Sequence, residues 1–373
     1  QPVFKGTVVR ARVIKPGALP SPVSTHTYFV TPQGRARYSL PVVALSIPED
    51  VLFDYDDGIY TAGVLFDGWR SANPTAAASP ASDANWHRRG EEHEYPAHFE
   101  LIEPGSSTAA LSQGVGVRVH GNATRAFRMK SLRLYARSSY GASSIAYPIF
   151  PDQPLDTYYR LILRNAGNDF GYAMFRDAAI QAIVAPLSFD TQAYRPAALF
   201  INGEFWGIHN IRERLDKHYV GEVYGVDRDN IDLLEDWGVV EEGDNLHYVA
   251  LLNYIRSNGA AGEAQYRHIE TQMDVDNYTD YQIAQIFSRN TDWPGNNIAY
   301  WRLRTNAYQP GAPLGHDGRW RWMMFDTDFG FGLEGGPTAY AHNTLAFATE
   351  PGGTSWPNPD WSTFLLRSLL TTD

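Results

Sequence analysis

Two short stretches in the last quarter of the chain combine carboxylate and amide side chains at a defined spacing. The first, residues 292–297, reads Asp-Trp-Pro-Gly-Asn-Asn and places Asp292 five residues before Asn297. Further on, an apolar run that begins at Trp320 ends in Asp326 and Asp328. Carboxylate and amide oxygens suit magnesium, and a carboxylate can also accept a proton from a hydroxyl group. The two stretches therefore predict metal-assisted chemistry on phosphate groups.

Protein kinases use this combination of residues. Their catalytic loop spaces a base Asp and a metal-binding Asn by five residues, and a later Asp-Phe-Gly motif supplies a second metal ligand. Residues 292–297 reproduce the spacing, and residues 328–330 read Asp-Phe-Gly. Either fragment alone is common by chance, whereas both in this order indicate phosphoryl transfer.

The composition is that of a globular protein. Of 373 residues, 43% are hydrophobic and 13% aromatic, which is enough for a large core in one or two domains. The net charge of −11 argues against nucleic acid as a partner. Because the chain has no cysteine, disulfides, thiolate nucleophiles and zinc–thiolate sites are excluded. No apolar stretch approaches the roughly 20 residues of a membrane-spanning helix, so we expect no membrane span.

The order of apolar residues predicts strands first and helices later. Strand patterns cover residues 40–47, 98–102, 114–121 and 130–135, and polar loops are expected at 71–92 and 332–360. Asn202-Gly203 predicts a type I′ turn in a hairpin that spans residues 194–211. Lys130 shares strand parity with Leu132 and Leu134, so it is expected to point toward the same apolar face.

Helical spacing appears at residues 175–184, 245–257 and 276–287, with Asp276 as the expected N-cap of the third helix. We therefore predict an α+β chain with a β-rich lobe at 36–212 and a helical lobe at 213–373. The chain begins with Gln-Pro and ends without a terminating signal, so we expect a cut start and a truncated second lobe. Residues 1–33 form a hairpin pattern that resembles the tail of a chitobiase-type β-sandwich.

A resemblance to a known family follows from several blocks in order. These blocks are residues 40–43, 58–60, 119–125, 130–134, 163–169, 175–177, 200–207, 290–292 and 325–330. They resemble the spore-coat protein H (CotH) kinase-like family over residues 36–373. The resemblance implies an atypical two-lobe protein-kinase-like fold and a bacterial, extracytoplasmic protein. It also implies ATP- and magnesium-dependent phosphorylation of secreted or cell-surface proteins, with a protein phosphoacceptor or polysaccharide-associated proteins as partners.

The resemblance assigns roles around the metal. Asp292 matches the catalytic-loop base, and Asn297 matches the loop residue that binds magnesium. Asp326 most resembles the metal-binding carboxylate, because in this family that residue is usually the first of an Asp-x-Asp pair. The literal Asp-Phe-Gly argues for Asp328 instead, and Asp328 is kept as a possible second ligand.

The resemblance also assigns nucleotide contacts. Lys130 matches the strand lysine that contacts the phosphates, and Arg125 matches a second basic phosphate contact. A typical kinase helix presents a Glu to the strand lysine. The helix at 175–184 has no Glu, and Asp177 and Gln181 are the candidates for that position.

Lys130 and Asp292 can also be explained by purely structural roles. Lys130 is also compatible with a lysine at a sheet edge, and Asp292 with a residue that caps the turn before Pro294. The missing helix Glu keeps open a catalytically weak pseudokinase that acts in surface assembly. The aromatic content keeps open a glycan-associated binding module.

Overall fold

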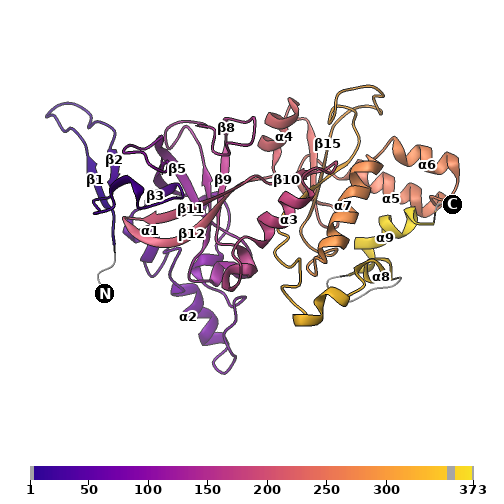
Figure 1. Ribbon diagram of the computed structural model, residues 1–373, viewed down its shortest axis with the longest axis horizontal. Helices are drawn as coiled ribbons and strands as arrows, with labels where there is room; N and C mark the ends of the chain where they lie inside the picture. The colour runs from indigo at the N-terminus through magenta and orange to yellow at the C-terminus, as the bar shows by residue number, and fades with distance from the viewer. Residues whose placement is uncertain (1–3, 351–357, 372–373) are drawn as a thin grey trace. The chain divides into compact units, whose positions relative to one another are not determined.

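The computed structural model describes residues 4–350 and 358–371 and shows a mixed α/β chain (Figure 1). The chain forms two compact units. The first contains the residues up to Gly167 together with Tyr194–Glu213, and the second contains Asn168–Ala193 and the residues from Arg214 onward. Residues 168–193, which the sequence placed in the first lobe, therefore lie in the second unit.

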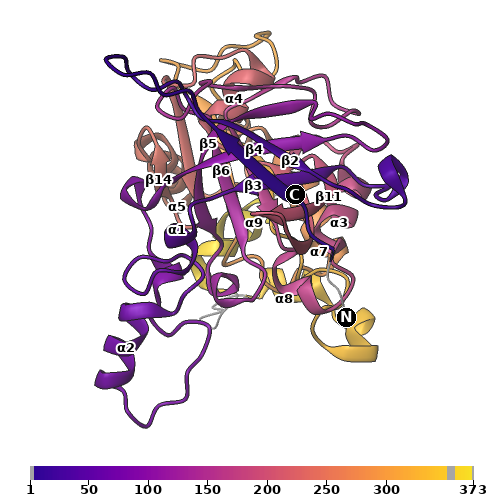
Figure 2. The same ribbon diagram turned by 90° about the vertical axis from the view of Figure 1, so that its left-hand side faces the viewer.

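The first unit is built on a closed barrel, which Figure 2 shows facing the viewer. Its strands, in order around the barrel, are β11 (Tyr194–Ile201), β12 (Glu204–Glu213), β9 (Arg160–Arg164), β6 (Ser131–Tyr135), β5 (Leu111–His120), β4 (Tyr95–Ile102) and β3 (Val42–Ser46). The parallel pairing of β11 with β3 closes the barrel, and the other neighbours are antiparallel. Closure removes the exposed edges that an open sheet of this length would present. The four predicted strands are confirmed, and their ends differ from the predicted ones by at most three residues.

The predicted hairpin turn is also confirmed. Asn202 has φ 51° and Gly203 has φ 81°, the two positive values that a type I′ turn needs. The Asn202 side chain accepts a hydrogen bond from the Ile47 N–H at 2.9 Å and donates one to the Ile47 carbonyl at 2.8 Å. The turn therefore also joins β11 to the segment after β3.

Smaller elements complete the first unit. They are the hairpin of β1 (Thr7–Ala11) and β2 (Ser24–Tyr28), the pair β7 (Ile145–Ala146) and β8 (Thr157–Tyr158), and the helices α1 (Glu49–Phe53) and α2 (Gly63–Ala72). The Phe29 ring contacts the Phe200 ring with centroids 4.7 Å apart, so the N-terminal hairpin packs on the barrel. The loop predicted at 71–92 is wrong in part, because it contains the end of α2 and short 3₁₀ turns at Asn85–His87 and Glu91–His93.

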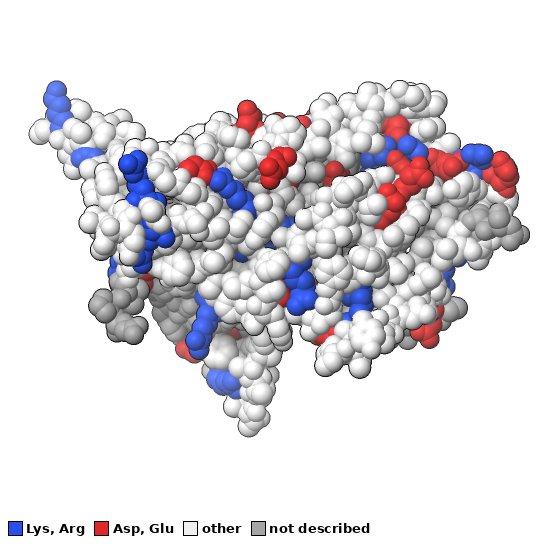
Figure 3. Space-filling model, in the orientation of Figure 1, with Lys and Arg blue, Asp and Glu red and all other residues white. Residues whose placement is uncertain are grey.

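The second unit was predicted to be a helical lobe, but it also contains a sheet. The strand order is β10 (Asp190–Thr191), β16 (Arg321–Met324), β15 (Ile298–Leu303), β13 (Ile231–Glu235) and β14 (Val239–Glu242). Its helices are α3 (Arg176–Val184), α4 (Lys217–Tyr224), α5 (Leu246–Asn258), α6 (Glu263–Glu270), α7 (Val275–Ser288), α8 (Thr344–Thr349) and α9 (Asp360–Leu369). Side chains of both signs are interspersed over α6 (Figure 3), where Arg267 pairs with Glu263 and Glu270.

Two local predictions in this unit need correction. The N-cap of α7 is Asp274, whose carboxylate accepts the Asn277 N–H at 3.1 Å, so the helix starts before the predicted cap Asp276. The loop predicted at 332–360 contains a 3₁₀ turn at Gly336–Ala341 and helix α8, which Asn343 caps. Its residues 351–357 lie outside the described part.

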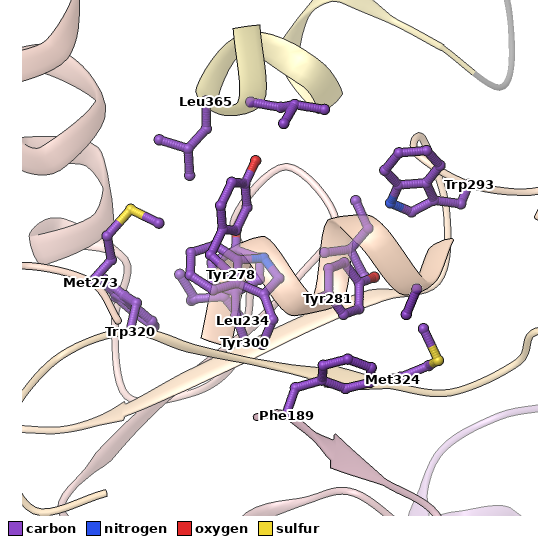
Figure 4. Close-up of a cluster of buried hydrophobic side chains, with 14 of the residues drawn as sticks. Phe189, Leu234, Met273, Tyr278, Tyr281, Trp293, Tyr300, Trp320, Met324 and Leu365 are labelled. Atoms are coloured by element: carbon purple, nitrogen blue, oxygen red, sulfur yellow. The ribbon is translucent and has the colours of Figure 1, made fainter. Parts of the chain in front are cut away.

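Aromatic side chains fill the core of the second unit. Figure 4 shows Tyr278 and Tyr281 of α7 beside Tyr300 of β15, with Trp293 and Trp320 at opposite sides of the cluster. Trp293 is 1% exposed and Trp320 is fully buried. Burial of such large rings is a dominant favourable contribution to folding.

We therefore predict that Trp293→Ala lowers the free energy of unfolding by about 3–5 kcal/mol, because it removes a buried ring and leaves a cavity. Chemical denaturation measures the change. Trp237→Ala, at a ring that is 66% exposed, is the matched control and is expected to have a much smaller effect. Equal losses in the two variants would contradict the assignment of Trp293 to the core.

Candidate functional site

The register of β15 and β16 brings the two predicted metal-binding stretches together. Ile298 pairs with Met324, and Trp301 pairs with Arg321. Asn297 directly precedes β15, and Asp326 follows β16 by two residues. Because the strands are antiparallel, Asn297 and Asp326 come to the same end of the sheet.

Asp292 is held at this end by two amide side chains. Its Oδ2 accepts a hydrogen bond from Asn296 Nδ2 at 2.8 Å and another from Asn297 Nδ2 at 2.9 Å. Its Oδ1 has no hydrogen-bond partner among residues 4–350 and 358–371. One oxygen therefore fixes the carboxylate, and the other is open to accept a proton.

The loop that carries Asp292 is anchored at two further points. The Asp292 N–H donates to Asn290 Oδ1 at 3.2 Å, and Asn290 Nδ2 donates to Gln285 of α7 at 3.0 Å. Asn290 is fully buried, and the next residue after Asp292 is the core tryptophan Trp293. These contacts position the carboxylate by buried groups on both sides of it.

Asn297 and Asp326 share an uncommon backbone conformation. Their φ angles are 58° and 53°, the left-handed region that L-residues enter at a cost of about 1–2 kcal/mol. Asn and Asp are the non-glycine residues most often found there, and such strained positions cluster at functional sites. Both strained residues lie at the same end of the sheet as Asp292.

The donor set at this end fits a magnesium ion. Asn297 Nδ2 donates to Asp292 Oδ2 and, at 3.4 Å, to the Asp326 carbonyl. Since a carboxylate can only accept, the amide orientation is fixed, and Asn297 Oδ1 is left as an oxygen donor. Together with the Asp326 carboxylate it offers the hard oxygen ligands that magnesium prefers, with other positions left for water and phosphate.

The segment after β16 is fixed to α3. Asp177 Oδ1 accepts the Thr327 N–H at 2.8 Å and the Thr327 hydroxyl at 3.0 Å, and it also accepts Gln181 Nε2 at 2.8 Å. Asp328 is 1% exposed, and its Oδ2 accepts the Asn168 N–H at 2.6 Å. Asp177 and Asp328 thus fix the backbone directly after Asp326.

The environment of Asp292 changes its acidity. Burial raises the pKa of its carboxyl group from 3.8 to about 6, and the negative charge of Asp326 adds to this effect. The hydrogen bonds from Asn296 and Asn297 stabilise the charged form and oppose the rise in pKa. A base whose pKa lies near the working pH is the most effective for proton transfer.

Lys130, in the first unit, is buried with 2% exposure as its parity predicted. Its Nζ donates to the carbonyls of Arg125 at 2.5 Å and Phe127 at 3.2 Å, and it lies 4.2 Å from the centroid of the Trp86 ring. Burial and the nearby Arg125 charge lower the pKa of Lys130 to about 7. Its ammonium group thus holds the segment that connects β5 and β6.

Arg125 has the same kind of role in the first unit. It is 5% exposed, and its guanidinium donates to four backbone carbonyls, those of Gly121, Val119, Trp86 and Arg88, at 2.7 to 2.9 Å. These contacts join residues 86–88 to the turn after β5. The phosphate contacts predicted for Lys130 and Arg125 stay predictions.

Within the described residues, no three His, Cys, Asp or Glu side chains lie close enough to hold a metal on their own. This statement does not include Asn297, because its side chain is an amide. In the same part of the chain, none of the helices combines the length and the apolar character needed to cross a bilayer.

A family model described as CotH kinase protein matches residues 117–373, more than half of the chain. The chain belongs to the CotH kinase family. Every predicted site residue of this CotH chain, from Arg125 to Asp328, lies in the matched range. No curated protein matches the chain. The likeness of residues 1–33 to a chitobiase-type module stays a prediction.

Three contacts of the predicted site residues were not expected from the sequence. Asn296 binds Asp292 as closely as Asn297 does, and the Asn-Asn pair was a usable signal for it. Thr327 was not singled out, although it lies between the two acidic residues and carries the contact to Asp177. No sequence signal pointed to Trp86, which reaches Lys130 from a distant loop.

We predict that Arg125→Met destabilises the fold by at least about 2 kcal/mol, because four carbonyls lose their shared donor. Thermal denaturation measures the change. Arg128→Met, at an exposed arginine three residues away, is the matched control and should leave the midpoint nearly unchanged. A stable Arg125 variant would contradict the structural role of this guanidinium.

We also predict a pH dependence that Asp292 causes. Because its folded-state pKa of about 6 lies above the ordinary 3.8, the folded protein binds this proton more tightly than the unfolded chain does. Its contribution to the free energy of unfolding therefore falls as the pH rises from about 4 to about 6. Carboxyl-detected NMR on wild type and Asp292→Asn identifies the resonance, and a midpoint near 4 would contradict the raised pKa.

Proposed function

We propose that this CotH chain is an atypical kinase that transfers the γ-phosphate of ATP to a Ser or Thr hydroxyl of a protein, with magnesium. The observation that carries the proposal is the arrangement of Asp292, with one oxygen held by two amides and the other open, beside Asn297 and Asp326. The match to the CotH kinase family supports it.

In the proposed reaction, Asp292 Oδ1 accepts the proton of the substrate hydroxyl. The hydroxyl oxygen bonds to the γ-phosphorus, the bond from that phosphorus to the bridging oxygen breaks, and ADP leaves with the electron pair. Asn297 Oδ1 and the Asp326 carboxylate would hold magnesium, which would offset the negative charge of the phosphates. Asp328 and Asp177 act mainly by positioning Asp326, with Asp328 as a possible further ligand.

The proposal includes finer expectations. Lys130 and Arg125 would contact the phosphates of ATP, and Asp177 would take the place of the usual helix Glu. The protein would act outside the cytoplasm of a bacterium, on secreted, cell-surface or polysaccharide-associated proteins. A chitobiase-type module beside it would fit that location.

A second candidate is a pseudokinase that binds partners without transferring phosphate. It is favoured by the contacts of Lys130 and Arg125, whose cationic groups bind backbone carbonyls. A protein that shows no thermal shift with ATP and magnesium, and no phosphotransfer, would support this candidate.

The first experiment is calorimetric titration of ATP with and without magnesium. Glycine accepts the left-handed backbone of Asn297 and Asp326, so Asn297→Gly and Asp326→Gly remove the ligands without adding strain. We predict that both variants stay folded and lose magnesium-dependent binding at least about tenfold, as expected for one charge-assisted ligand.

Asp276→Ala is the control for this experiment, since it removes an exposed carboxylate of the same unit away from the Asp292 loop. Its ATP affinity should equal that of the wild type. Magnesium-dependent binding that survives in Asp326→Gly, or full phosphotransfer by that variant, would overturn the proposal.

A further inference from the structure

A second feature of the second unit lies at the other end of β15 and β16. A cavity of about 420 Å³ is lined by His247 of α5, Gln272 after α6, Arg302 of β15 and the connection between β15 and β16. Arg302 lies five residues after Asn297 along an extended strand, which separates the cavity from the Asp292 end by about 16 Å. The volume falls within the range of about 300–1,000 Å³ that small-molecule sites occupy.

Arg302 offers a fixed donor to this cavity. The residue is 7% exposed, its Nε donates to Asp232 Oδ2 at 2.9 Å, and its Nη1 donates to the Gly318 carbonyl at 3.2 Å. Its Nη2 has no hydrogen-bond partner within the described ranges. A planar guanidinium that is held through two of its nitrogens presents the third in a defined direction.

His247 offers a second fixed donor. Its Nδ1 accepts the indole N–H of Trp320 at 2.9 Å. Since an indole can only donate, the proton of the neutral imidazole must lie on Nε2. Burial and the charge of Arg302 lower the pKa of His247 to about 4, so the ring is neutral at physiological pH. The described part of the chain supplies no partner for Nε2.

The other lining groups both donate and accept hydrogen bonds. Thr305, Asn306 and Tyr308 contribute two hydroxyls and an amide from the β15–β16 connection. No hydrogen bond within the described ranges involves these three side-chain groups. Gln272 adds a carbonyl oxygen, because its Nε2 donates to Thr271. Such a mixture suits a ligand whose own groups both donate and accept.

The charges around the cavity balance. Asp232 accepts Arg302 and Arg304, and Arg304 also pairs with Asp244, so that two cations face two anions. With His247 neutral, the cavity presents no net charge. An anion at Arg302 Nη2 would be repelled by the carboxylates of Asp232 and Asp244, whereas an uncharged polar ligand would not.

The cavity is also pre-formed. The segment after α6 is fixed by the Trp320 N–H, which donates to the Gln272 carbonyl at 3.0 Å, and by the Asp274 N–H, which donates to the Trp320 carbonyl at 3.0 Å. The β15–β16 connection is fixed by the Gln309 N–H, which donates to the Asp317 carbonyl at 3.0 Å. Walls held by backbone hydrogen bonds reduce the entropy cost of binding.

We propose that this cavity binds an uncharged polyhydroxylated ligand, of the kind that a hexopyranose unit of a glycan presents. Sugar hydroxyls both donate and accept, which matches the fixed donors Arg302 Nη2 and His247 Nε2 and the hydroxyl and amide groups around them. The Tyr308 ring, which has the Arg319 guanidinium 5.3 Å from its centroid, adds an aromatic group to the cavity wall. The site is separate from the Asp292 cluster and does not depend on the proposed kinase activity.

The test is saturation-transfer NMR on the full chain with the methyl glycosides of glucose, galactose and N-acetylglucosamine. We expect saturable binding of at least one of them to the wild type. Asn306→Ala removes an exposed amide and should weaken binding about fivefold, as expected for one hydrogen bond. Ala307→Trp places a large ring in the cavity and should abolish binding while ATP binding stays unchanged.

Asn253→Ala, the same substitution at an exposed Asn of α5 outside the cavity, is the matched control and should bind like the wild type. Glucuronate and inorganic phosphate test the anionic alternative. Binding of these anions without binding of the neutral glycosides would overturn the proposal. Absence of binding by all probes, or glycoside binding that Ala307→Trp leaves intact, would also overturn it.

Discussion

The pairing of β15 with β16 is the constraint on which the candidate site depends. With Ile298 opposite Met324, the residue before one strand and the residues after the other meet at a single end of the sheet. A slip of one residue would turn every side chain of one strand to the other face. The same register places Arg302 and Trp320 at the opposite end, where the cavity lies.

Buried tryptophans hold this strand pair at both of its ends. Trp293 ties the Asp292 loop into the core (Figure 4). Trp320 donates its indole N–H to His247 of α5 and its backbone N–H to the carbonyl of Gln272, which follows α6. Polar groups that must keep a fixed geometry thus sit directly on large packed rings. Pre-organisation of this kind is what positioning and electrostatic catalysis require.

Much of the first unit could be predicted from the sequence, because strand alternation and the Asn202-Gly203 turn are local signals. Asp292, Asn297 and Asp326 were found for a similar reason, since their spacing and the end of an apolar run are visible in the chain. The sheet of the second unit was missed because its strands are separated along the chain by helices and long connections, so no series of neighbouring strand patterns marks it. The contact of Asp177 with Thr327 joins residues 150 positions apart, and no local pattern encodes it.

The most direct test of the proposed metal site is to replace magnesium with manganese and to record NMR spectra of the amide-labelled protein with ATP. Paramagnetic broadening decreases steeply with distance from the metal. If Asn297 and Asp326 hold the metal, the amides of Asn296, Asn297 and Asp326 broaden first, and Asn297→Gly removes this effect. Broadening centred elsewhere, for example at Asp232 and Asp244, or unchanged in Asn297→Gly, would contradict the assignment of the metal to this end of the sheet.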